Sequence, residues 1–171
     1  MKVVSGGQTG VDQAALDAAL ALGLQTGGEM PAKFMTLQGQ RPDMAETYGM
    51  TENASPSYDV RTFANVSAAD ATIRFARYFS SAGERCTLRA IHKYKKPYFD
   101  INASREGAFP NPEHIAKWLY DQNVQVLNVA GNSHTTAIGI YDEAYAYFVK
   151  VFALWKDHVN TNQRRACGQA V

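Results

Sequence analysis

The chain has 171 residues, and its 46% hydrophobic and 19% charged residues are typical of a single globular domain rather than a disordered or fibrous protein. Seventeen basic and sixteen acidic side chains leave a formal net charge of +1. The protein therefore has no global field that would draw it to nucleic acid or to an anionic membrane, and we expect neither as a partner. A small ligand must instead be recognised locally.

The ends and the cysteines give two further expectations. The amino-terminal residues show neither the apolar core of a signal peptide nor a spanning segment of about 20 residues, so we expect a cytoplasmic location. Cys86 and Cys167 have no CxxC or Cys/His spacing, so we expect neither a zinc or other metal site nor a disulfide framework.

The predicted elements begin with a strand, a turn and a helix. Residues 2–5 are a short β-branched run that breaks at Gly6-Gly7, and apolar residues then recur at helical spacing over 11–22. Gly23 is placed where a helix commonly ends. Residues 26–57 sustain no period, which predicts a long loop able to cover a ligand.

Helices and strands alternate through the rest of the chain. The patterns predict a helix over 58–67, a strand over 71–76, a helix over 83–94, a strand over 98–101, a helix capped by Asn111-Pro112, a strand over 124–129 and a helix over 141–152. This alternation predicts a doubly wound α/β fold with a mostly parallel sheet and helices on both faces. We expect one ligand-binding domain over 1–155 and a polar tail over 156–171.

Three loops should meet at the carboxyl edge of such a sheet, where ligands bind in doubly wound folds. They follow the first strand (6–10), the strand at 71–76 (79–83) and the last strand (131–136). The first is the most distinctive, because Ser5-Gly6-Gly7-Gln8-Thr9-Gly10 runs into a helix start, where glycines and exposed N–H groups suit a phosphate. It lacks the GK[ST] of a Walker A loop. A tight turn without a ligand is the alternative interpretation.

These residues, with others further on, resemble the putative molybdenum carrier proteins, a family related to the nucleotide-binding phosphoribohydrolases often mislabelled lysine decarboxylases. The resemblance extends over most of residues 2–150. The stretches that carry it are 4–19, Glu52-Asn53-Ala54-Ser55, Tyr58, Arg61-Thr62, Asn65-Val66, Asp70, 127–131 and Gly139-Ile140-Tyr141.

The resemblance implies a Rossmann-like fold, a homo-oligomer, and a pocket for molybdenum cofactor or a related phosphorylated ligand. It assigns the candidate binding residues Gly6, Gly7, Gln8, Thr9, Gly10, Asp12, Arg61, Asn65, Gly83 and Gly131. The chain departs from the family in the second loop, where Ser80-Ser81-Ala82-Gly83-Glu84-Arg85 replaces a Gly-Gly-Thr type of turn. Glu84 could satisfy the helix dipole in place of a phosphate, and Arg85 could compensate.

Polar residues of the third loop complete the candidate site. Asn132, Ser133 and His134 follow the last strand and offer hydrogen bonds at its carboxyl end. Arg61 could clamp an anion or form a helix-surface ion pair. Arg74, Arg77, Arg85 and Arg89 could form a basic rim or a solvated face.

The aromatic stripe over 141–152 could be core or a subunit interface, and exposure of Tyr145, Tyr147 and Trp155 would favour the interface. No catalytic set emerges, since the sequence has no nucleophile elbow, no HExxH and no spaced carboxylate pair. The resemblance implies the same, because the catalytic glutamate of the phosphoribohydrolases would fall near Arg89. We therefore expect a binding or carrier protein rather than an enzyme, with Gly10→Asp abolishing binding while the fold persists.

Besides an interaction-only module, which is the fallback if the glycine loop binds nothing, two alternatives stay open. One is a hydrolase of a nucleotide N-glycosidic or phosphate bond, with Glu84 or Asp12 as the acid/base group. The other is a protein that sequesters a nucleotide signal, which only the identity of the ligand and the genomic context would separate from a carrier.

Overall fold

The computed structural model of the protein describes residues 1–104 and 109–168. The main sheet consists of β1 (Lys2–Val4), β2 (Gln25–Met30), β5 (Met50–Glu52), β6 (Ala71–Ala76), β7 (Tyr98–Asn102) and β8 (Val126–Gly131). All neighbouring strands are parallel, in the order β5-β2-β1-β8-β6-β7. All six strands therefore end at one edge, and the loops that follow them are brought together there.

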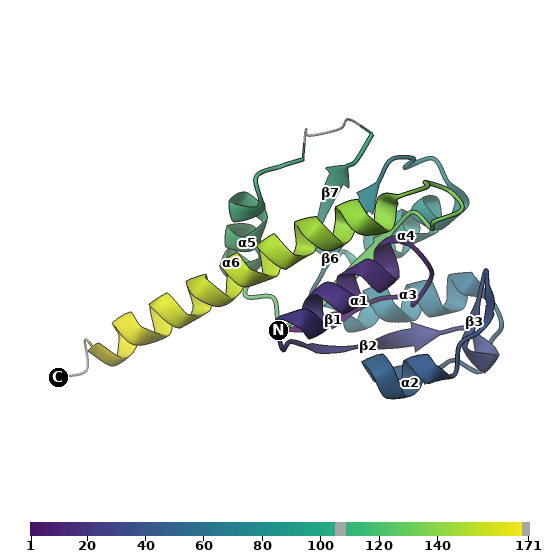
Figure 1. The fold of residues 1–171 in the computed structure, drawn as a ribbon, viewed down its shortest axis with the longest axis horizontal. Coiled ribbons are helices and arrows are strands. Elements are labelled where there is room, and N and C mark those ends of the chain that lie inside the picture. Colours follow the sequence, from purple (N-terminus) through teal and green to yellow (C-terminus); the bar gives the residue numbers. More distant parts are fainter. Residues whose placement is uncertain (105–108, 169–171) are drawn as a thin grey trace.

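Helices cover both faces of the sheet. They are α1 (Val11–Ala21), α3 (Tyr58–Ala68), α4 (Ala82–Tyr94), α5 (Pro112–Asp121) and α6 (Ile140–Gly168). Helices α1, α5 and α6 pack together on one face of the sheet, and α3 pairs with α4 on the other face (Figure 1). The predicted α/β Rossmann-like fold with helices on both faces is confirmed.

The main core lies between the sheet and α1, α5 and α6. Every residue of β6 is buried, which fits a central parallel strand covered on both faces. On α1, Ala14, Ala15, Ala18 and Ala19 have no exposed surface, and their small side chains let the helix lie close to the strands. Asn111 caps α5 as predicted, since its side chain accepts a hydrogen bond from the Glu113 N–H.

The prediction of a long loop over 26–57 is wrong. This segment holds β2, a 3-10 turn (Ala32–Phe34), the hairpin of β3 (Met35–Thr36) and β4 (Gly39–Gln40), the short helix α2 (Asp43–Tyr48), and β5. Leu16, Met30, Met44 and Met50 form a second core cluster here. Each element contributes only one or two apolar residues to that cluster, so none of them shows a sustained period.

The aromatic stripe of α6 belongs mainly to the core. Tyr147 is 5% exposed and Trp155 is 8% exposed, so neither offers the exposed surface that an interface would need in this chain. Tyr145 is half-buried. The helix continues past Trp155 to Gly168 and projects beyond the sheet (Figure 1). The side chain of Cys167 and residues 169–171 of the predicted tail lie outside the described residues.

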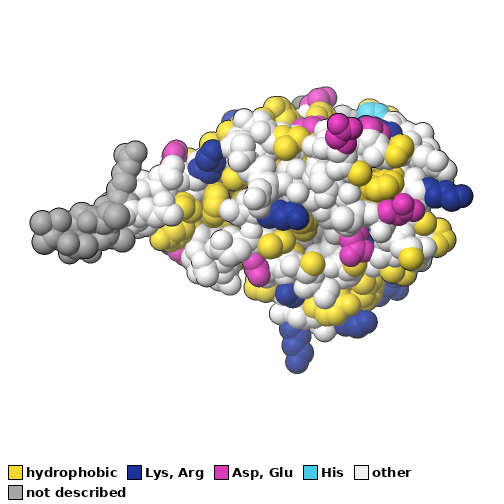
Figure 2. Space-filling view, turned by 90° about the horizontal axis from the view of Figure 1, so that it is seen from below, with side chains coloured by type: hydrophobic (Ala, Val, Ile, Leu, Met, Phe, Trp, Pro, Cys, Tyr) yellow, Lys and Arg dark blue, Asp and Glu magenta, His cyan; other side chains and the backbone are white. Residues whose placement is uncertain are grey.

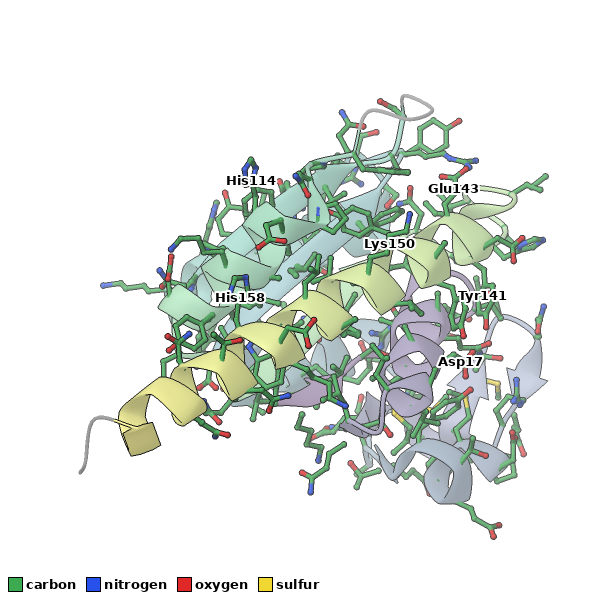
Figure 3. The ribbon with its side chains drawn as sticks, turned by 60° about the vertical axis from the view of Figure 1, so that its left-hand side comes forward. Asp17, His114, Tyr141, Glu143, Lys150 and His158 are labelled. Carbon is green, nitrogen blue, oxygen red and sulfur yellow. The ribbon has the colours of Figure 1, made fainter. Side chains whose placement is uncertain are left out.

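A carboxylate joins three helices beside the second cluster. Asp17 on α1 accepts a hydrogen bond from the hydroxyl group of Tyr48, at 2.7 Å. It accepts another from the hydroxyl group of Tyr141, at 2.6 Å; Figure 3 labels Asp17 and Tyr141. Burial, followed by the hydrogen bond to Asp17, raises the pKa of both tyrosines, so both hydroxyl groups stay protonated donors at neutral pH.

The surface carries charges of both signs. The face shown in Figure 2 carries scattered Lys and Arg side chains as well as Asp and Glu side chains. Among the described helices, none combines the length and apolar character needed to cross a bilayer.

Candidate functional site

A cleft of about 390 Å³ opens at the carboxyl edge of the sheet. The loops after β1, β6 and β8 form its base, and the first turns of α3 and α4 form its wall. Its lining residues are Gln8, Asp12, Leu37, Tyr58, Asp59, Arg61, Thr62, Ser81, Ala82, Gly83, Glu84, Cys86, Thr87, Ala130, Gly131, Asn132, Ser133 and Thr136. The three loops that the sequence singles out are thus brought to one place.

The N–H groups of the first loop are largely bonded within the protein. The Gly7 N–H donates to Ser5 Oγ at 3.2 Å, the Gln8 N–H to Asp12 Oδ2 at 3.2 Å, and the Thr9 N–H to Gln8 Oε1 at 3.1 Å. The Val11 N–H donates to the carbonyl of Asn132. In this conformation the loop does not present these groups to a phosphate, contrary to the expectation from its glycines.

Gly10 shows what a glycine of this loop does. Its φ of 97° is strained for other residues, and a Cβ there would lie 2.5 Å from the Asn132 carbonyl oxygen and 2.8 Å from the His134 nitrogen. Gly10 therefore lets the first and third loops touch. The expectation that Gly10→Asp would spare the fold is wrong, because that side chain would separate the two loops.

The buried Asp12 pairs with the half-buried Arg61 at the cleft base. Asp12 is 4% exposed, and Arg61 Nη1 lies 3.7 Å from its Oδ2. Burial raises the pKa of Asp12, while Arg61 and the backbone N–H groups of Gln8, Gly6 and Gly131 oppose the rise. The guanidinium also lies over the Tyr58 ring, 5.8 Å from its centroid. Asp12 thus takes the place that an anion would fill in the first loop.

The first turn of α4 faces the cleft from the opposite side. Ser81 caps the helix by accepting a hydrogen bond from the Glu84 N–H, at 3.4 Å. The N–H groups of Ala82 and Gly83 belong to a first turn, where no helical partner exists. A Cβ at Gly83 would meet no atom within 4 Å, so the space beside this turn is open.

Glu84 does not cap the dipole at the helix end. Its side chain is 2% exposed, and its Oε2 lies 3.7 Å from Arg74 Nη1 on β6. That guanidinium forms a two-point ion pair with Asp100, with Nε 2.8 Å from Oδ1. Burial raises the pKa of Glu84 to about 8, with Arg74 opposing the rise and the charges of Asp12 and Asp100 adding to it.

Of the two alternatives for these four arginines, a basic rim or a solvated face, the basic rim is not formed. Arg74 is buried, Arg77 pairs with Glu143, and Arg89 pairs with Asp59 at 3.1 Å. Arg85 donates to the Ser80 carbonyl, and it is not among the lining residues. The sequence does not predict that Arg74 is buried, because the ion-pair partners that allow an arginine to lie in an apolar strand are distant in the chain.

The Asn132 side chain attaches the loop after β8 to the loop after β6. Asn132 is 2% exposed, and its Oδ1 accepts from the N–H groups of Arg77 and Tyr78, both at 2.9 Å. Beside it, Ser133 Oγ lies 3.0 Å from Thr136 Oγ1, and both residues line the cleft. Asn132 therefore positions the loops, whereas Ser133 and Thr136 are placed to meet a ligand.

The predicted site residues divide between the cleft and its supports. The cleft is lined by Gln8, Asp12, Arg61, Gly83, Gly131, Asn132 and Ser133, whereas Gly6, Gly7, Thr9, Gly10, Asn65 and His134 do not line it. Asn65 is buried and bonds to the Ser5 carbonyl and the Glu29 N–H, and His134 is exposed. Neither side chain faces the cleft.

Several lining residues were not predicted as site residues. Leu37, at the tip of the β3–β4 hairpin, is 56% exposed, and its N–H donates to Gln8 Oε1 at 3.0 Å. Tyr58 begins α3 and is 37% exposed. The start of α3 could have been suspected, because helices that precede parallel strands also begin at the carboxyl edge. The hairpin carries no such signal.

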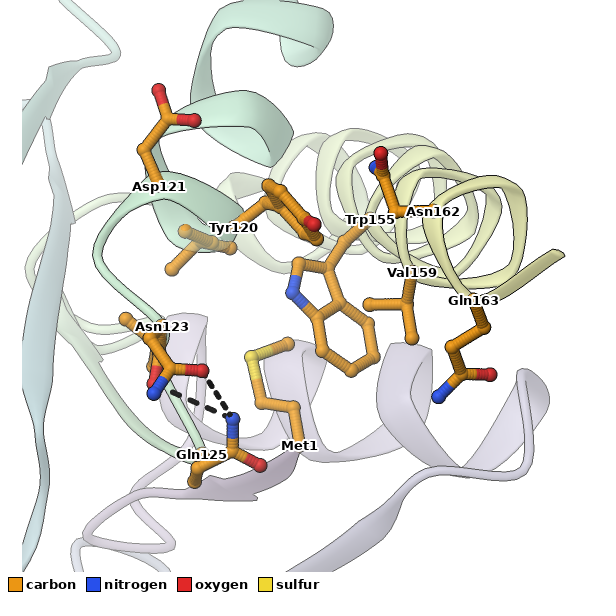
Figure 4. Close-up of a pocket in the computed structure, with 11 residues that line it drawn as sticks. Met1, Tyr120, Asp121, Asn123, Gln125, Trp155, Val159, Asn162 and Gln163 are labelled. Carbon is orange, nitrogen blue, oxygen red and sulfur yellow. Dashed lines mark hydrogen bonds between the residues drawn. The ribbon is translucent and has the colours of Figure 1, made fainter. Parts of the chain in front are cut away.

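A larger groove, of about 870 Å³, lies at the other end of the sheet (Figure 4). Met1, Trp155 and Val159 form its apolar part, and side-chain amides such as Gln125 its rim. It lies beside the starts of β1 and β8, where doubly wound folds do not usually place their ligand sites. We therefore take the smaller cleft as the candidate site.

Among the side chains that the structure describes, no three His, Cys, Asp or Glu residues converge as they would around a metal ion. The fold and the cleft together define a Rossmann-like protein with a cleft at the carboxyl edge of its parallel sheet. Comparison with known families agrees. The chain belongs to the circularly permutated YpsA family of the SLOG group, which it matches over residues 3–152.

A solved structure supports the same relationship. The chain is similar to a putative molybdenum carrier protein from Syntrophus aciditrophicus SB, with 30% sequence identity and a TM-score of 0.74 over 90% of this chain and 93% of that one. A search of curated proteins gives no match. The resemblance inferred from the motifs is thus confirmed.

Proposed function

We propose that the protein is a binding or carrier protein for a small phosphorylated ligand, with molybdenum cofactor or a related pterin or nucleotide as the candidates. The observation that carries the proposal is the convergence of three loops and the first turn of α4 around one cleft of about 390 Å³. That volume is within the range of small-molecule sites. The name of the similar carrier protein supports the same class of ligand.

The two ends of the cleft differ in chemistry. The open first turn of α4 offers N–H groups and the positive end of the helix dipole, and Ser133 and Thr136 add hydroxyl groups. Leu37 and Tyr58 give the mouth two apolar surfaces. We assign the oxyanion of the ligand to the α4 end and its ring to the mouth. The expected anion site therefore moves from the first loop to the second.

A hydrolase is the second candidate, favoured by the buried Glu84. A carboxyl group that stays protonated near neutral pH suits a general acid, and Asp12 lines the same cleft. Incubation with nucleoside monophosphates, with chromatography for released base or phosphate, tests this candidate. Absence of turnover at high protein concentration would exclude a hydrolase.

Gly83→Asp tests the site itself. The new carboxylate would fill the open space at the α4 end and repel an oxyanion, while an acidic residue in a first helical turn preserves the helix. We expect the affinity for adenosine 5′-monophosphate, a probe with a two-ring heterocycle and one phosphate, to fall at least about tenfold, or about 1.4 kcal/mol.

The control is Glu46→Asp, because Glu46 is exposed on α2. The affinity of this variant for adenosine 5′-monophosphate, measured by isothermal titration calorimetry, should equal that of the unchanged protein. Equal affinity of Gly83→Asp, with an unchanged circular dichroism spectrum, would contradict the assignment of the oxyanion to α4.

A further inference from the structure

The hairpin of β3 and β4 lies outside the main sheet, beyond the carboxyl end of β2 (Figure 1). Among the described residues, its two strands pair only with each other. An isolated two-stranded hairpin is at best marginally stable in water. The position of this hairpin must therefore depend on what it touches, either the rest of the protein or a ligand.

Two neighbouring residues show how the hairpin is seated. Thr36 is 4% exposed, so this part of the hairpin rests on the protein, whereas Leu37 at the tip is 56% exposed and lines the cleft. A lone exposed leucine is ordinary on a protein surface. This leucine differs, because it lies at the mouth of the cleft, where we place the ring of the ligand.

The tip is held to the first loop by one side chain. The Leu37 N–H donates to Gln8 Oε1 at 3.0 Å, which is the single hydrogen bond between residues 35–40 and the rest of the described chain. The same oxygen accepts from the Thr9 N–H at 3.1 Å, and Gln8 itself lines the cleft. A ligand in the cleft therefore meets the side chain that holds the tip.

The chain enters the hairpin through a strained pair of residues. Lys33 and Phe34 are consecutive and have φ of 61° and 51°. Such left-handed backbone is unfavourable for residues other than glycine and is found at ligand clamps and switch regions. The Lys33 N–H donates to Glu52 Oε1 at 2.6 Å, and the Phe34 carbonyl accepts from the Arg41 N–H at 2.9 Å. These bonds fix the base of the hairpin, so a change of torsion beyond them would move the tip.

We propose that the β3–β4 hairpin is a lid, whose tip closes over a phosphorylated heterocycle in the cleft so that Leu37 packs on the ring. This inference rests on the proposed function and assigns the recognition of the ring to a moving element. Closure removes the leucine and the face of the ring from water together, which is favourable. A phosphorylated sugar without a ring system of this kind gives Leu37 nothing to cover. The site therefore selects heterocyclic phosphates over sugar phosphates.

Hydrogen–deuterium exchange of the full-length protein tests the closure. Adenosine 5′-monophosphate and ribose 5-phosphate are matched probes, because they share the phosphorylated sugar and differ in the heterocycle. With saturating adenosine 5′-monophosphate, we expect the amides of residues 35–40 to exchange at least about fivefold more slowly. With ribose 5-phosphate, the exchange of these amides should stay as it is in the free protein.

Three variants test the part of Leu37. Leu37→Ala should weaken the binding of adenosine 5′-monophosphate about fivefold, abolish the slower exchange of residues 35–40, and leave the affinity for ribose 5-phosphate unchanged. Leu37→Met keeps an apolar side chain and should retain the affinity to within about twofold. Leu20→Ala is the matched control, because Leu20 is 41% exposed on α1 and does not line the cleft, and it should behave as the unchanged protein.

Three results would overturn the inference while leaving the proposed function intact. They are unchanged exchange of residues 35–40 when calorimetry shows that adenosine 5′-monophosphate is bound, equally slow exchange with ribose 5-phosphate, and full affinity of Leu37→Ala for the nucleotide. If neither probe binds the unchanged protein, the proposed function fails and the lid with it. Because Leu37 is exposed, its substitution should leave the fold intact, which circular dichroism checks.

Discussion

Replacement of Arg74 by methionine is expected to lower the free energy of unfolding by about 3 kcal/mol or more at pH 9, and by clearly less at pH 6. At pH 9 Glu84 is mostly ionised beside Arg74. Without the guanidinium the pKa of Glu84 rises further, so the buried carboxyl must take up a proton, which adds up to about 1.4 kcal/mol to the loss. At pH 6 Glu84 is neutral, so the substitution mainly removes the pairing with Asp100, which is 39% exposed at its side chain.

The measurement is urea unfolding at both pH values. Arg89→Met is the matched control, because Arg89 is 65% exposed at its side chain and pairs with an equally exposed Asp59. Its effect should stay below about 1 kcal/mol. An equal loss for Arg74→Met at pH 6 and pH 9 would show that Glu84 does not depend on Arg74.

The unchanged protein should show the same linkage in its stability. The pKa of Glu84 is about 8 in the folded state and 4.5 as its ordinary value, so the folded state binds more protons between these pH values. The stabilisation from this group is complete below pH 4.5 and is lost as pH rises to about 8. The slope is at most about 1.4 kcal/mol per pH unit.

Gly10→Ala is expected to destabilise the protein by about 3 kcal/mol. The added methyl group would lie 2.5 Å from the Asn132 carbonyl oxygen, on a backbone with φ of 97°. The first and third loops would move apart, so both stability and the shape of the cleft should suffer. Thermal and urea unfolding measure the loss.

Gly83→Ala is the control for this prediction. It adds the same methyl group in a helix, where nothing lies within 4 Å, and should change stability by less than about 1 kcal/mol. Similar effects of the two substitutions would mean that Gly10 does not hold the loops together.

The strong periodic signals predicted most of the fold. The alanine face of α1, the Asn111 cap of α5 and the apolar run of β6 are local features, and each lies where its pattern indicates. The prediction of a long loop over residues 26–57 was wrong because the apolar residues of this segment pack in a cluster assembled from four elements. Gly28 in β2, with φ of 124°, further hides the strand pattern.

The candidate site was predictable in place but not in detail. Parallel strands bring the three loops to one edge, so the position follows from topology. Whether Asp12 or a ligand takes the N–H groups of the first loop depends on side-chain directions that no spacing reveals. Glu84 likewise looks like a helix-end carboxylate until its burial against Arg74 is known.

The most direct test of the central claim is native mass spectrometry of protein purified without added ligand, followed by identification of any small molecule in a denatured extract. We expect a stoichiometric phosphorylated pterin or nucleotide, with or without molybdenum, that is lost from Gly83→Asp. A ligand retained by Gly83→Asp, or protein that stays free of ligand even after incubation with phosphorylated pterins and nucleotides, would contradict a carrier site at the α4 end.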